Sequence, residues 1–112
     1  MHNFEKLIFG QKSISLAKEI YIACKELSSD EKFGLAYQMK RSAVSIPSNI
    51  AEGSGRNNNK EFNHFLAIAL GSSNTANLSK ELNHLTEDSV NKILSDLIEI
   101  QKMIYGFKQN LK

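Results

Sequence analysis

The chain has 112 residues, of which 41% are hydrophobic and 23% are charged, with a formal net charge of +2. This length and composition fit one globular domain, residues 1–112, with a single core. The net charge is too small to indicate nucleic-acid binding by itself, because dedicated domains are usually more basic. Short apolar stretches and the absence of a signal-peptide pattern exclude a membrane protein, so we expect a cytoplasmic location.

The first predicted helix covers residues 11–27. Its apolar side chains recur at spacings of three and four, which is typical of an amphipathic helix. They are Ile14, Leu16, Ala17, Ile20, Tyr21, Ala23, Cys24 and Leu27. Cys24 is the only cysteine, so no internal disulfide can form, and we expect it to be a small buried apolar side chain.

A second helix is predicted to begin at Ser28, because Ser28 and Glu31 have the spacing of a capping box. Its apolar face is formed by Ala36, Met39, Ala43, Ile46 and Ile50. Gly53 and Gly55 then supply the flexible backbone that ends the helix. The only proline, Pro47, lies inside this helix, where it removes a backbone donor and costs about 3 kcal/mol unless the surroundings compensate.

The third and fourth helices also begin at predicted caps. Asn58 with Glu61 precedes one apolar pattern, and Thr86 precedes another. The third pattern contains Phe62, Phe65, Leu66, Ala69, Leu78, Leu82 and Leu85. The fourth contains Val90, Ile93, Leu97, Ile100, Ile104, Phe107 and Leu111. Four such helices with short connections predict an all-α antiparallel up-down-up-down four-helix bundle with a proline-containing second helix.

The run RSAVSIPSNIAEGSGR, residues 41–56, resembles the signature of a bacterial four-helix bundle family encoded in intervening sequences of large-subunit ribosomal RNA genes. The family-motif positions present here include Arg41, Pro47, Ser48, Asn49, Glu52 and Gly53. The likeness covers nearly the whole chain, including residues 33–35, 60–62 and 66–72.

The resemblance implies an up-down bundle of a kind that forms homopentameric rings in several relatives, and it supplies no catalytic residues. A related branch is the accessory variability determinant protein of diversity-generating retroelements, a basic pentamer that binds nucleic acid and a reverse transcriptase. Two features depart from the family pattern. Gly10 stands where a tryptophan is common, and Thr75 and Asn77 stand where acidic residues are common.

Few residues have the spacing of a catalytic or metal site. The three histidines lack metal-ligand spacing, so we predict no metal and no cofactor; they are His2, His64 and His84. Glu52 and Glu61 lie near one helix junction but have no nucleophile or base partner. Residues 53–56 end a helix and lack the lysine of a nucleotide-binding loop. We therefore predict that the protein is not an enzyme.

Polar residues near the proline have predicted structural roles. Ser42, Ser45 and Ser48 can bond to carbonyls of the preceding turn. Asn49 and Glu52 are the best candidates for a buried or interfacial polar network, because the proline leaves backbone groups that need partners. The alternative for these two residues is contact with a ligand or a partner.

The charges are distributed unevenly along the predicted bundle. One end combines the start of the first helix, the junction of the second and third, and the end of the fourth. It collects Lys6, Lys12, Arg56, Lys60, Lys102, Lys108 and Lys112, with Glu5, Glu52 and Glu61. The opposite end is acidic, and the middle is neutral, with Lys18, Lys40 and Arg41 against Glu19, Asp96 and Glu99. Helix dipoles account for part of this asymmetry, but a ring with like ends together would repeat the basic end and attract phosphate backbones.

We therefore predict a non-enzymatic homo-oligomer, a pentamer, that binds RNA or DNA backbones through its basic end in association with ribosomal RNA. The predicted nucleic-acid contacts are Lys12, Arg56, Lys60, Lys102 and Lys108. The alternative is a scaffold or accessory subunit that binds a partner protein through apolar outer rows, with the charges serving solubility.

Overall fold

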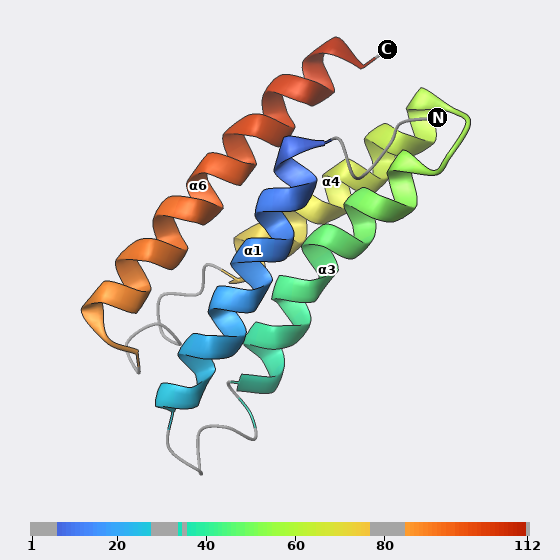
Figure 1. The fold of residues 1–112 in the computed structure, drawn as a ribbon. Coiled ribbons are helices and arrows are strands. Elements are labelled where there is room, and N and C mark those ends of the chain that lie inside the picture. The colour runs from blue at the N-terminus through green and yellow to red at the C-terminus, as the bar shows by residue number, and fades with distance from the viewer. Residues whose placement is uncertain (1–6, 28–33, 35, 77–84, 112) are drawn as a thin grey trace.

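The computed structural model describes residues 7–27, 34, 36–76 and 85–111 (Figure 1). Its elements are α1 (Ile8–Ala23), the 3₁₀ turn η2 (Cys24–Glu26), α3 (Tyr37–Ser54), α4 (Asn59–Ala76) and α6 (Glu87–Asn110). Consecutive helices run in opposite directions, α1 and α4 each pack against both α3 and α6, and the described residues contain no strand. The predicted all-α up-down bundle is confirmed. None of the described helices is both long and apolar enough to cross a membrane.

One apolar core runs along the bundle, because each helix buries the stripe that its three-and-four spacing places on one face. In α6 this stripe consists of Ile93, Leu97, Ile100 and Ile104, each at most 2% exposed. At one end the Phe107 ring meets Phe9 and Phe62, with ring centroids 5.2 and 5.5 Å away. These aromatic contacts join α1, α4 and α6.

The first helix begins earlier than predicted, at Ile8 instead of residue 11. Phe9 is 4% exposed and contacts Phe107, so the helix extends to bring this ring into the core. Ser13 donates a hydrogen bond of 2.7 Å to the Gly10 carbonyl within the same buried segment. This helical segment ends at residue 27, its C-cap, as predicted, but its last turn is the tighter 3₁₀ turn η2.

The predicted caps of α4 and α6 are confirmed. The Asn58 Oδ1 accepts from the backbone amides of Lys60 and Glu61, at 2.7 and 3.2 Å. The Thr86 Oγ1 accepts from the Ser89 amide at 3.3 Å. Two other predictions lie outside the described residues. They are the Ser28–Glu31 capping box and the inward-facing positions of Leu78 and Leu82.

The helix ends where predicted, with Gly55 as its C-cap, but the predicted role of Gly53 in ending it is wrong. Gly53 lies inside the helix and Gly55 caps it with φ −81°, so neither uses a left-handed backbone. A Cβ at Gly53 would lie 2.8 Å from Phe62 Cδ1 and 2.8 Å from Phe65 Cβ. Gly53 therefore permits α3 and α4 to approach closely. Pro47 lies within the continuous helix α3.

Candidate functional site

The loop between α3 and α4 lies at the end of the bundle where α1 begins and α6 ends (Figure 1). All five predicted nucleic-acid contacts are described residues, so their surroundings can be compared. Lys60 and Lys102 are exposed, and neither side chain has an ion-pair partner within the described part of the chain. These two ammonium groups are available to an anion.

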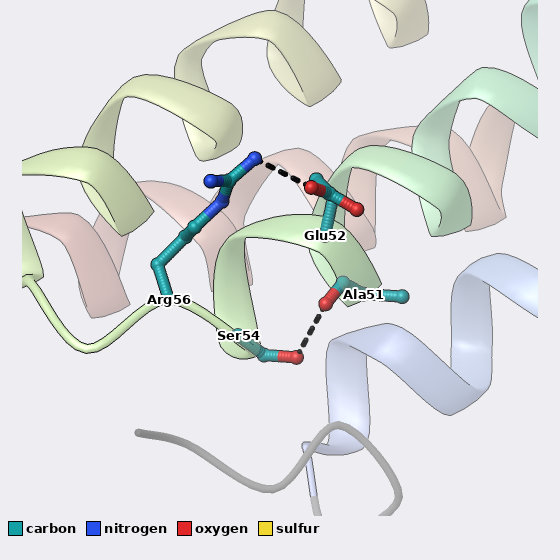
Figure 2. Close-up of polar contacts among 4 residues, drawn as sticks. All are labelled: Ala51, Glu52, Ser54 and Arg56. Atoms are coloured by element: carbon teal, nitrogen blue, oxygen red, sulfur yellow. Dashed lines mark hydrogen bonds and ion pairs between the residues drawn. The ribbon is translucent and has the colours of Figure 1, made fainter.

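Arg56 is held by its own loop and helix (Figure 2). Its Nη2 donates to Glu52 Oε1 at 2.5 Å, and the guanidinium carbon lies 5.0 Å from the centroid of the Phe65 ring. The Arg56 amide donates to the Gly53 carbonyl at 3.1 Å, while Ser54 Oγ donates to the Ala51 carbonyl at 2.9 Å. The Arg56 side chain is still 41% exposed. A surface pair of this kind is weak, so Arg56 retains donors for an external anion.

Two of the predicted contacts have internal partners. Lys108 Nζ donates to Asn63 Oδ1 at 2.6 Å and to the Asn63 carbonyl at 3.1 Å, which ties α6 to α4. Lys12 pairs with Glu99 across α1 and α6, and the hydrogen bond and charge of Glu99 raise the pKa of Lys12. Glu99 lies near the middle of α6, as predicted, so the pair corrects the placement of Lys12, whose charge faces the middle of that helix.

The basic end is therefore less positive than the sequence predicted. Its described charged residues are Lys12, Arg56, Lys60, Lys102 and Lys108, with Glu52 and Glu61, and the charge of Lys12 is offset by Glu99 of the middle of α6. The other predicted members, Lys6, Lys112 and Glu5, lie outside the described residues. The structure leaves Lys60, Lys102 and part of Arg56 as the available cationic groups.

The motif residues of α3 point to different surroundings. Asn49 Nδ2 donates to the Ser45 carbonyl at 2.8 Å and to Ser45 Oγ at 3.0 Å. Ser45 Oγ in turn lies 2.7 Å from Ser72 Oγ on α4. Glu52 instead faces Arg56, so the structure does not bring Asn49 and Glu52 into one network. Ser72 was not predicted as a partner of Ser45, because its place in the family-like run of residues 66–72 does not indicate which side chain of another helix it meets.

An apolar groove of about 470 Å³ lies between α1 and α3 and includes Pro47. Its other lining residues are Ile14, Ala17, Lys18, Tyr21 and Ile22. Ile22 is 63% exposed and Tyr21 is 44% exposed. Ser48, the next motif residue, is exposed on α3. The groove is an apolar surface of the kind that protein contacts cover.

A carboxyl pair that the sequence did not predict lies between α1 and α6. Glu19 Oε1 is 2.9 Å from Lys92 Nζ. A hydrogen bond with Glu19, burial and the Glu19 charge raise the pKa of Asp96. Burial would raise the pKa of Glu19, but hydrogen bonds with Asp96 and Lys92 lower it overall. The two carboxyls titrate as a unit in which Asp96 takes up a proton first.

Within the described residues, no group of three histidine, cysteine or acidic side chains is arranged to hold a metal ion. His64 is exposed beside Phe65, whereas His2 and His84 lie outside the described residues. Cys24 is buried, as predicted, and burial raises the pKa of its thiol.

Residues 5–106 match the family model described as 23S rRNA-intervening sequence protein. A comparison with curated proteins found no match. The predicted relation to the accessory variability determinant proteins stays a prediction.

Proposed function

Because the chain belongs to the 23S rRNA-intervening sequence protein family, we propose that it is a non-enzymatic homo-oligomer that binds the phosphate backbone of RNA. The observation that carries the proposal is the placement of exposed Lys60 and half-exposed Arg56 together at the α3–α4 end of the bundle. The family description names 23S rRNA intervening sequences and no ligand, and ribosomal RNA is the RNA that we propose first. DNA is a second polyanion that the same charges would attract.

The binding mode follows from the charges. Lysine and arginine contacts to phosphates release counterions, so affinity falls as salt rises and depends little on sequence. The described end carries few free cations, so one protomer binds weakly. A ring of protomers, for which we retain the predicted pentamer, would repeat Lys60, Lys102 and Arg56 around its axis and strengthen the attraction.

Self-association is supported by the apolar groove beside Pro47. Ile14, Tyr21 and Ile22 expose apolar surface there and lie away from the Arg56 loop. A second copy of the chain that covers this groove would remove the surface from water and leave the basic end accessible. The same groove supports the alternative function, a scaffold that binds a different protein.

The direct test is the binding of a mixed-sequence RNA, followed by fluorescence anisotropy at several salt concentrations. Arg56→Gln with Lys60→Gln should weaken binding and reduce the slope of log affinity against log salt by about 1 to 2. Lys25→Gln with Lys40→Gln removes the same charge from the other half of the bundle and serves as the control. An equal loss of RNA affinity in both double variants would show that only the net charge matters and would contradict the proposed site.

Light scattering distinguishes the two candidate functions. An oligomer that gains RNA mass at low salt and loses it at moderate salt supports backbone binding. An oligomer or monomer that gains no RNA mass at either salt refutes it and favours the protein scaffold.

A further inference from the structure

The first half of α3 and the later part of α4 lie towards the other end of the bundle from the Arg56 loop (Figure 1). Residues of both segments line a second, polar pocket. Its volume is about 470 Å³, which falls in the range of small-molecule sites. The described lining residues are Gly34, Tyr37, Gln38, Arg41, Ser42, Ser45 and Ser72. None of them is acidic, so the described lining contains no group that repels an anion.

Arg41 is the charged group of this pocket. It is exposed, and it has no ion-pair or hydrogen-bond partner within the described residues, in contrast to Arg56. A guanidinium offers donors in a planar fork that matches phosphate oxygens. Gln38 and Ser42 lie within one turn of Arg41 and add an amide and a hydroxyl donor.

A chain of hydrogen bonds orients one more donor. Asn49 Nδ2 donates to Ser45 Oγ at 3.0 Å, and Ser45 Oγ lies 2.7 Å from Ser72 Oγ. Either hydroxyl can donate in the second bond, and in either direction the hydrogen of the other hydroxyl stays outside the pair. Because both Ser45 and Ser72 line the pocket, that hydrogen can serve a ligand oxygen in either case.

Tyr37 gives the pocket an aromatic wall. The side chain is 63% exposed, so its ring has a face that is open to a second planar group. Stacking of a base on an aromatic side chain contributes about 1–3 kcal/mol. The pocket thus combines donors suited to a phosphate with a surface suited to a base.

We propose that this pocket binds a nucleoside monophosphate, with the phosphate held by Arg41, Ser42 and Ser72 and the base stacked on Tyr37. The site is separate from the basic end at Arg56 and Lys60. The pocket binds a single nucleotide, whereas the basic end contacts successive phosphates of an RNA backbone. The two proposals therefore stand or fall independently.

The test is titration of the full chain with adenosine 5′-monophosphate, by calorimetry and by amide chemical shifts in NMR. We expect saturable shifts at Gln38, Ser42 and Ser72. Arg41→Gln should raise the Kd at least about tenfold, the usual size of a lost charged hydrogen bond. Lys40→Gln removes one charge from the neighbouring position, where the ammonium lies 5.0 Å from the Tyr21 ring centroid, and should leave the Kd within about twofold.

Two comparison ligands test the parts of the proposal. Adenosine without phosphate should bind at least about tenfold more weakly, and inorganic phosphate should bind more weakly than the nucleotide. Tyr37→Leu should bring the nucleotide Kd close to that of inorganic phosphate. Absence of saturable shifts at these amides up to about 10 mM nucleotide, or an equal Kd for adenosine, overturns the proposal. Arg41→Gln should bind RNA as tightly as the wild type, so a loss of nucleotide binding in this variant can be distinguished from a loss of RNA binding at the basic end.

Discussion

Replacing Gly53 with alanine tests the contact between α3 and α4 most directly. The new Cβ would lie 2.8 Å from both Phe62 Cδ1 and Phe65 Cβ, closer than carbon atoms pack. Phe65 Cβ is fixed to the backbone of α4, so the helices must separate. Overpacking of this kind costs about 1–3 kcal/mol, and the better helix propensity of alanine offsets about 1 kcal/mol. We expect a net loss of about 1 kcal/mol in the free energy of unfolding, measured by urea denaturation.

Gly106→Ala is the matched control, because Gly106 is exposed in α6 and a Cβ there would meet nothing within 4 Å. It should gain about 1 kcal/mol from helix propensity alone. The two substitutions should therefore change the free energy of unfolding in opposite directions, and the two variants should differ by about 2 kcal/mol. An equal gain from Gly53→Ala would show that the close approach of α3 and α4 does not constrain position 53, and the packing argument would be wrong.

Two further predictions concern contacts made by α6. The pKa of Asp96 is raised in the folded state, so this group contributes stability that is present below its unfolded pKa, about 3.9, and lost as pH rises through the folded value. Asp96→Asn should therefore raise the thermal midpoint at pH 7 and lose this advantage below about pH 4; a lower midpoint at pH 7 would contradict the sign. Lys108→Met removes the hydrogen bonds to Asn63 and should cost about 1–2 kcal/mol in urea denaturation, whereas exposed Lys102→Met should change stability by less than about 0.5 kcal/mol. Equal losses of stability in the two variants would show that the bonds between Lys108 and Asn63 do not stabilise the packing of α4 against α6.

The sequence predicted those parts of the fold that depend on local patterns. The three-and-four repeat of α6 is long enough to determine its buried face without reference to another helix. The Asn58 and Thr86 caps were also predictable, because a cap depends on amides only two or three residues away. The start of α1 was not, because Phe9 is drawn into the helix by contact with Phe107, nearly a hundred residues later.

The surroundings of the site residues were harder to predict because they depend on which helices face one another. Lys108 reads as a free cation in the sequence, yet it bonds to Asn63, 45 residues away. Gly53 reads as a helix terminator, yet its lack of a side chain serves a contact with α4. Charge counts along a helix identify the end of the bundle where a residue lies, but they do not identify the group opposite it.

The spacing of the motif in α3 explains why one run contributes to several surfaces. Arg41, Ser45, Asn49 and Gly53 are four residues apart and form a stripe along one face of the helix. This stripe meets Ser72 near one end and Phe62 near the other, as antiparallel packing against α4 requires. Residues between these positions rotate to other faces, which places Pro47 in the apolar groove beside α1. Substitutions on the stripe should therefore change the α3–α4 contact and its pocket, while substitutions at Pro47 should act on whatever covers the groove.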